Sequence, residues 1–186
     1  MWNTFTDFKE GRLQHFYYYN MAYEKPLYLH INLSKDGEHR PAFWYIASTI
    51  RHIGVGNYGA LNEDQKASAR EVLRIYKNYR DFFVHGSFDG PDPLTHIHAL
   101  PGRGAVLLCF NDRNVKQTVN LSLDKNQLGC SHSIGRVDSL FGPSANVRVK
   151  TGKCLVTFTL RPYDVAVFRV CNKTGITRNS ATNGQL

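Results

Sequence analysis

The chain has 186 residues, enough for one compact domain or two small ones but too few for a complete (β/α)8 barrel of about 250 residues. With 42% hydrophobic and 20% charged residues its composition is globular, and no apolar run approaches the roughly 18 residues that span a bilayer. The formal net charge of +8 would by itself suggest an anionic partner such as nucleic acid.

The positive charge is confined to the second part of the chain. Residues 1–101 carry eleven basic and eleven acidic side chains, whereas residues 102–186 carry twelve basic and four acidic ones. The basic residues of the second part stand singly and do not alternate with aromatic residues, a pattern typical of solvated strand faces. We therefore expect neither nucleic acid nor a membrane as a partner.

The N-terminal segment is rich in aromatic residues and contains no secretory signal. Asp7, Lys9 and Glu10 fall where such a signal needs an uninterrupted apolar stretch, so the sequence assigns no compartment. Aromatic side chains crowd residues 2–45. We interpret them as packing surface between helices and strands, with stacking on sugar rings as the alternative.

A strand and a short helix are predicted next. Residues 26–33, PLYLHINL, form a strand-like segment in which Tyr28, His30 and Asn32 share the face opposite the leucines. Pro41 suits a first helical position, and the apolar run that follows it predicts a buried helix ending before the segment Ile-Gly-Val-Gly.

Residues 62–85 are predicted to form a long amphipathic helix, because apolar side chains recur there at three- and four-residue spacing. Asn62 followed by Gln65 fits a capping box at its start. Gly86 can adopt the left-handed conformation just past its last turn. The first hundred residues thus read strand, helix, strand, helix, which predicts a parallel sheet built from βα units.

After residue 101 the helical period disappears, and short apolar or alternating segments separated by turns predict an antiparallel β-sandwich. The predicted strands are residues 105–111, 117–123, 146–150, 154–160 and 164–170. The last stretch is polar and lacks periodicity, which predicts a disordered tail.

Four runs in the first part resemble a known family. YNMAYEKPLYLHINL, FWYIASTIRHIGVG, YKNYRDFFVHGSF and THIHALP resemble the C-terminal part of bacterial α-galactosidase-like (melibiase-like) glycoside hydrolases, a resemblance that covers residues 12–171. It implies that residues 26–33 are the seventh strand of a (β/α)8 barrel, that HIGVG is the eighth, and that residues 62–85 are the closing helix.

The fold class implied by this resemblance is a partial α/β barrel followed by an all-β domain. Residues 1–101 would be the C-terminal end of a TIM-barrel catalytic domain, containing its last βα units. Residues 102–171 would be the antiparallel sandwich, and residues 172–186 the polar tail. A truncated parallel sheet leaves an unpaired edge, so we expect the isolated fragment to self-associate.

The resemblance implies a C-terminal fragment of a glycoside hydrolase, which is inactive alone because the catalytic carboxylates lie upstream. Glycoside hydrolysis needs two carboxyl groups flanking the scissile bond. Asp36 and Glu38 lie two apart in a polar loop, whereas Glu63 and Asp64 are explained by the start of a helix. No catalytic residue is assigned here, and the alternative function is a non-catalytic carbohydrate-binding or structural module.

His30, Asn32 and Asn57 are the candidate substrate-binding residues. His30 and Asn32 would point into the barrel near its active-site face, where their side chains can exchange hydrogen bonds with sugar hydroxyls. Asn57 and Tyr58, just past the eighth strand, are similarly placed. The alternative is that these are hydrogen-bonded polar groups of the barrel core. The expected partner is the carbohydrate substrate of the parent protein.

No metal or cofactor is predicted. His96 and His98 share one face of a strand, and would hold a metal only if further ligands such as His85 or His132 converged on them. The pair Arg51-His52 is interpreted as favourable charge at a helix C-terminus. The cysteines form no Cys-x-x-Cys pair and lie mostly in apolar strand contexts, at positions 109, 130, 154 and 171.

Overall fold

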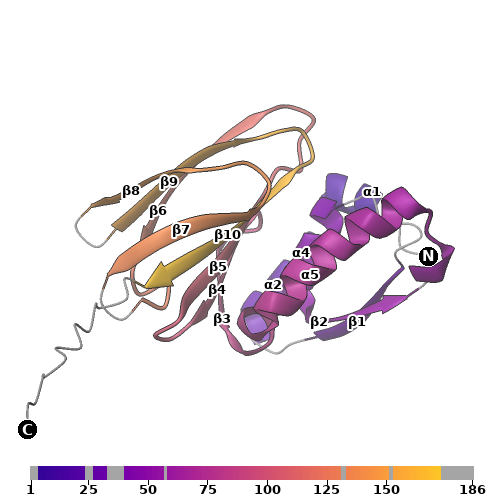
Figure 1. Cartoon of the computed structure of the whole chain (residues 1–186), viewed down its shortest axis with the longest axis horizontal. Helices are drawn as coiled ribbons and strands as arrows, with labels where there is room; N and C mark the ends of the chain where they lie inside the picture. Colours follow the sequence, from indigo (N-terminus) through magenta and orange to yellow (C-terminus); the bar gives the residue numbers. More distant parts are fainter. Residues whose placement is uncertain are drawn as a thin grey trace, which may run out of the picture.

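The computed structural model describes residues 4–23, 27–32, 40–56, 58–130, 133–150 and 153–172. Within these ranges the helices and one pair of strands come first, over residues 4–85, which we call the helical part. Two antiparallel sheets follow over residues 87–172, and they lie beside the helical part along the long axis of the molecule (Figure 1). The helices are α1 (Thr4–Lys9), α2 (Gln14–Tyr23), α4 (Arg40–Ile50) and α5 (Glu63–His85), with a 3-10 turn at Tyr58–Ala60.

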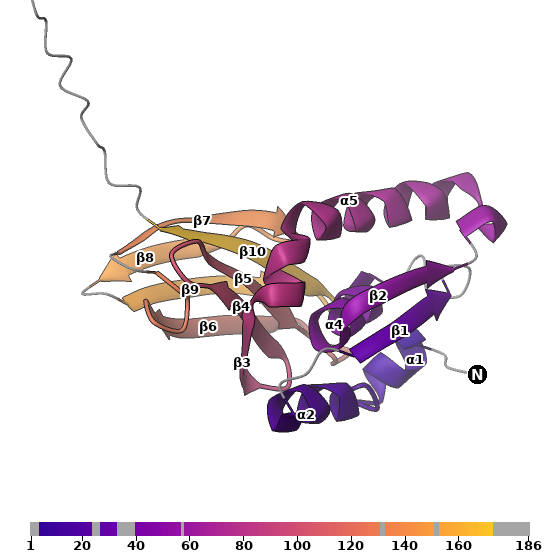
Figure 2. The same ribbon diagram turned by 90° about the horizontal axis from the view of Figure 1, so that it is seen from below.

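The predicted pair of parallel strands is confirmed. β1 (Leu27–Asn32) and β2 (Arg51–Gly56) form a parallel sheet in which Leu27 lies opposite Arg51 and Asn32 opposite Gly56. Helix α4 connects the two strands, as a parallel pair requires, and Figure 2 shows the resulting βαβ unit. Within the described ranges neither strand has a second neighbour.

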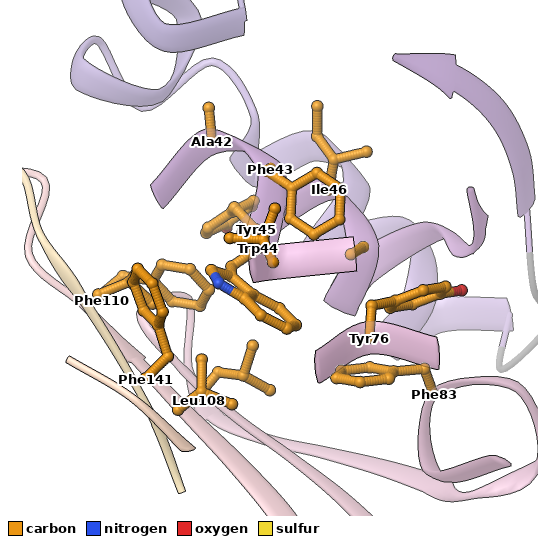
Figure 3. Close-up of a cluster of buried hydrophobic side chains, with 14 of the residues drawn as sticks. Ala42, Phe43, Trp44, Tyr45, Ile46, Tyr76, Phe83, Leu108, Phe110 and Phe141 are labelled. Carbon is orange, nitrogen blue, oxygen red and sulfur yellow. The ribbon is translucent and has the colours of Figure 1, made fainter. Parts of the chain in front are cut away.

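Helix α4 is the centre of the helical part. Every residue from Pro41 to Ile50 is buried, which explains why its sequence is predominantly apolar. The helix contacts β1 and β2, and also two strands of a five-stranded sheet, β5 (Gly104–Phe110) and β10 (Val165–Asn172). Figure 3 shows Trp44 beside Phe83 of α5 and Phe141 of β7 (Ile134–Phe141), with ring centroids 6.1 and 6.3 Å away.

The predicted helix over residues 62–85 is confirmed as α5, including its capping box. Asn62 Oδ1 accepts a 2.9 Å hydrogen bond from the Gln65 backbone, and Gln65 Oε1 accepts a 3.1 Å bond from the Asn62 backbone. The expected left-handed Gly86 is wrong, because its φ of −70° and ψ of 147° are extended. Glycine is needed there for space, since a Cβ atom would lie 2.3 Å from the Phe82 carbonyl oxygen.

The predicted antiparallel strands are also confirmed. One sheet has the order β3-β4-β5-β10-β7, with β3 (Ser87–Asp92), β4 (Thr95–Leu100), β5 (Gly104–Phe110), β10 (Val165–Asn172) and β7 (Ile134–Phe141). The other has the order β6-β9-β8, with β6 (Gln117–Asp124), β9 (Lys153–Leu160) and β8 (Asn146–Lys150).

The domain limits at residues 101 and 171 stay predictions. Strand β4 ends at Leu100 and pairs with β5 across the turn at Pro101, with Leu100 opposite Gly104. Hydrogen bonding therefore joins β3 and β4 to the strands that follow residue 101. The tail from residue 173 onward lies outside the described residues.

The five-stranded sheet is shared by two hydrophobic cores. Along β5, Val106, Leu108 and Phe110 belong to the core formed with the helices, whereas Leu107 and Cys109 belong to the core of the sandwich. The alternation of strand side chains thus buries all seven residues of β5. On β4 the face toward the helices carries His96 and His98, which lie opposite the apolar residues Leu108 and Val106 of β5.

Candidate functional site

The parallel strands bring the predicted substrate-binding positions to one edge. Asn32 is the last residue of β1 and lies opposite Gly56, the last residue of β2, while His30 lies opposite Gly54. For His30 and Asn32 the description covers the backbone alone, and Asn57 lies outside the described residues. Their role in substrate binding therefore stays a prediction.

Tyr58 follows this edge and is anchored to α5. Its hydroxyl accepts a 3.3 Å hydrogen bond from Nη1 of Arg70, and its ring packs against the core of the helical part. The contact fixes the chain where it leaves β2. Tyr58 thus has a structural explanation that does not require a ligand.

Three acidic residues of the described helices have structural explanations. Glu63 and Asp64 occupy the first turn of α5, and a hydrogen bond from Lys66 lowers the pKa of the exposed Glu63 carboxyl. Asp7 is buried and forms a 3.0 Å ion pair with an arginine. Asp36 and Glu38 lie outside the described residues. This arrangement offers no observation that assigns a general acid or a nucleophile.

A buried polar cluster joins the helical part to the sandwich. The hydroxyl oxygen of Ser48 on α4 lies 3.0 Å from Nδ1 of His96 and 2.8 Å from Nε2 of His98, both on β4. All three side chains have no solvent exposure. On its other side, Nε2 of His96 lies 3.0 Å from the carbonyl oxygen of Pro93.

Aromatic rings surround the two imidazoles. The ring of Tyr17 stacks on His96 with a centroid distance of 5.7 Å and an interplanar angle of 14°. The remaining rings within this cage come from four elements, namely Tyr45 of α4, Phe83 of α5, Phe88 of β3 and Phe110 of β5. Burial in this cage lowers the pKa of His96 to about 3 and lowers that of His98 well below its usual value.

The histidine pair on β4 is thus held by a serine. Among the described residues, no group of three or more His, Cys, Asp and Glu side chains converges as metal ligands would. His85 is exposed at the end of α5, and His132 lies outside the described residues. Sequence reasoning found the two histidines from their spacing but missed Ser48, whose position in an apolar helix carries no local signal.

Arg51 directly follows the last residue of α4, and its side chain contacts β3 and the residue that caps α5. It is the first residue of β2, with a φ of 65°, and its Nη1 donates a 3.1 Å hydrogen bond to the carbonyl oxygen of Gly86. Its guanidinium lies over the ring of Phe88, 5.8 Å from the centroid. The side chain therefore links β2 to the start of the sandwich instead of extending past α4.

All four cysteines are free thiols, and three of them are buried in the sandwich core. Burial raises the pKa of Cys109, Cys130 and Cys154, which keeps these thiols protonated and unreactive. No nucleophilic cysteine is therefore assigned.

The helices of the described segments include none that is long and apolar enough to cross a membrane.

Comparisons with known proteins identify the fold. No protein-family model and no curated protein sequence match the chain. Among solved structures, the chain is similar to an α-amylase of Anoxybacillus reported as a new glycosyl hydrolase subclass, with a TM-score of 0.56, 16% identity and 86% of this chain covered. The chain spans 42% of the length of that α-amylase.

Two further structures are weaker matches. A debranching enzyme of Nostoc punctiforme has a TM-score of 0.49 and 11% identity over 69% of this chain and 30% of its own. An α-amylase from H. orenii has a TM-score of 0.42 and 13% identity over 76% of this chain and 39% of its own. The similarity to the Anoxybacillus α-amylase, at 16% identity, shows a shared fold alone.

The solved structure that this chain resembles is an α-amylase, so the comparisons do not support the α-galactosidase-like resemblance. The runs that suggested that family contain β1, helix α4 followed by β2, the end of α5, and β4. These patterns follow from packing βα units against an antiparallel sheet, so they do not distinguish one such hydrolase from another.

Proposed function

We propose that this chain is the C-terminal part of a glycoside hydrolase, contributing the last βα units of a (β/α)8 barrel and a β-sandwich to a longer protein that hydrolyses O-glycosyl bonds. The observation that carries the proposal is the similarity to the Anoxybacillus α-amylase. It covers 86% of this chain, a share too large to lie within the helical part or the sandwich alone.

The two-stranded parallel sheet gives independent support. Parallel strands occur almost always in sheets with both faces covered, and in a barrel each strand has a neighbour on both sides. In the described part of the chain, β1 and β2 pair with each other alone. Further strands supplied by a longer protein would satisfy both free edges.

The chain's contribution to substrate binding would lie at the carboxyl ends of β1 and β2. Active sites of such barrels form at this end of the strands. His30, Asn32 and Asn57 are the residues proposed to bind sugar hydroxyls there. The two carboxyl groups that the reaction needs would come from preceding strands.

The test compares the 186-residue chain with the longest natural protein that contains it. Each is incubated with an aryl α-maltooligoside, chosen because the similar structure is an α-amylase, and with an aryl α-galactoside as the comparison substrate. The longer protein should hydrolyse the first substrate, and the chain alone should hydrolyse neither.

Turnover by the purified chain alone, abolished by a substitution within it, would contradict the proposal. A longer protein that lacks preceding βα units would contradict it as well. In that case the chain would be a non-catalytic module, either carbohydrate-binding or structural. Retention on an immobilised α-glucan would indicate a carbohydrate-binding module, and no retention would indicate a structural one.

A further inference from the structure

The cluster of Ser48, His96 and His98 has a single consistent pattern of donors and acceptors. A backbone carbonyl can only accept, so the 3.0 Å contact with Pro93 places a proton on Nε2 of His96. In a neutral ring Nδ1 is then an acceptor, and the Ser48 hydroxyl donates to it. The hydroxyl has one proton, so it must accept its second bond from Nε2–H of His98.

This pattern leaves no place for an additional proton. Nδ1 of His98 is buried without a hydrogen-bond partner among the described residues. A proton on that nitrogen would therefore be unsatisfied and charged in the interior. A proton on Nδ1 of His96 would point at the hydroxyl proton that Ser48 donates to it, so Ser48 would have to turn that proton away and the present hydrogen bond would be broken.

The groups that face the cluster do not compensate a positive charge. Tyr17 of α2 and Tyr45 of α4 contact His96, and burial raises the pKa of both phenols, so they stay neutral. The guanidinium of Arg51 from β2 and the ring of His96 both oppose a positive charge on His98, against which the backbone of Ser48 acts as a weaker, favourable contribution.

Carboxylates of the described segments act on this region at most from a distance. Asp89 and Asp92 of β3 act electrostatically on Tyr17, and the described carboxylates form neither a hydrogen bond nor an ion pair with either imidazole. From α5 and β5 the rings of Phe83 and Phe110 face the pair. The site is therefore built to hold two neutral histidines.

The position of the cluster gives it a mechanical consequence. Ser48 belongs to α4, the central helix of the helical part, whereas both histidines belong to the five-stranded sheet. Strand β9 lies in the other sheet and packs its side chains into the sandwich core. Disruption at Ser48 therefore acts on the contact of α4 with the sheet and leaves the core beneath β9 in place.

We propose that the hydrogen-bonded chain of His96, Ser48 and His98 is a pH-sensitive latch, which holds the helical part on the β-sandwich while both imidazoles are neutral and releases it when they take up protons. Acidification should therefore loosen α4 before it unfolds the sandwich.

The test is carried out on the whole chain by nuclear magnetic resonance. At neutral pH the ring nitrogen shifts of both His96 and His98 should report a proton on Nε2. During acidification, the amides of α4 should lose protection from hydrogen exchange about one pH unit above those of β9.

Variants that cannot titrate should remove this separation. In His96→Asn the carboxamide oxygen can replace the Nδ1 acceptor, and in His98→Gln the carboxamide N–H can replace the Nε2–H donor. The double variant should keep α4 protected to a pH about one unit lower than the wild type does. His85→Gln, at the exposed end of α5, is the matched control and should behave as the wild type.

Three outcomes would overturn the proposal. The first is loss of protection in α4 and β9 at the same pH in the wild type. The second is a folded double variant whose α4 opens at the same pH as in the control. The third is a wild-type chain in which either imidazole titrates near its ordinary pKa while α4 stays protected. This outcome needs no variant, so it decides the question even if the double variant does not fold.

Discussion

The hydroxyl group of Tyr17 on α2 donates a 2.7 Å hydrogen bond to the backbone carbonyl of Gly90 in β3. The tyrosine ring lies so close that a Cβ atom added at Gly90 would be 2.4 Å from its Cε2 atom. The same ring stacks on His96. The absence of a side chain at Gly90 is therefore what allows α2 to dock against the edge of the five-stranded sheet.

Gly90→Ala is expected to lower the free energy of unfolding by about 1–3 kcal/mol, because the added methyl group must displace a buried aromatic ring. Urea denaturation at neutral pH measures the change. Gly59→Ala is the matched control, since a Cβ atom at Gly59 would have no neighbour within 4 Å. Equal stability of the two variants would show that Tyr17 moves without cost.

Asn62→Ala is expected to lower the free energy of unfolding by about 1 kcal/mol, because it removes the side-chain acceptor of the capping box at α5. Asn78→Ala places the same change at an exposed position within the helix, where alanine is the better helix former. Thermal unfolding of both variants checks the prediction. A loss of stability at Asn78 as large as that at Asn62 would contradict the capping role.

Local signals explain which elements the sequence could predict. The capping box and regular apolar spacing of α5 are contained within the helix itself, so both its type and its start could be read. Helix α2 was missed because its aromatic residues do not fall on one face, with Tyr17 buried and Tyr18 and Tyr23 exposed. Strand β3 was missed because it contains Gly90 and Pro91, residues that are tolerated at a sheet edge.

The polar cluster shows why the rest of the structure could not be read from the sequence. The contacts of Ser48 lie 48 and 50 residues further along the chain, and they depend on α4 packing against β4. A serine in an apolar helix predicts neither partner. The spacing of His96 and His98 predicted a shared face correctly, but the residue that this face contacts is fixed by tertiary packing.

Stability should fall on acidification below pH 6.5. Burial lowers the pKa of His96 from 6.5 to about 3 and that of His98 well below 6.5, so in this range the unfolded chain binds more protons than the folded one. The stabilisation is therefore complete above pH 6.5 and decreases as the pH falls toward 3, by up to about 1.4 kcal/mol per pH unit for each imidazole.

Urea denaturation at several pH values between neutral and acidic measures this slope. The double variant of His96→Asn and His98→Gln should have a flatter profile, because neither replacement titrates. Parallel profiles for the wild type and the double variant would mean that other groups cause the acid sensitivity.

The isolated chain is expected to self-associate. In the described segments β1 and β2 pair with each other alone, and Tyr18, Met21 and Tyr23 are exposed on α2. Unpaired strand edges and exposed apolar side chains both favour association. Light scattering at increasing protein concentration should show species larger than 21.2 kDa. A monodisperse monomer would argue that other residues of this chain cover these surfaces.

His30→Ala and Asn32→Ala should each lower kcat/KM of the longer hydrolase by about 2- to 10-fold, the range expected for losing a neutral hydrogen bond to a sugar hydroxyl. Both residues lie toward the carboxyl end of β1, where the register places them opposite β2. Steady-state kinetics on the aryl α-maltooligoside provide the measurement, with Asn78→Ala on α5 as the control. If both variants kept the turnover number and Michaelis constant of the wild type, the residues would be polar groups of the barrel core, with no contact to the substrate.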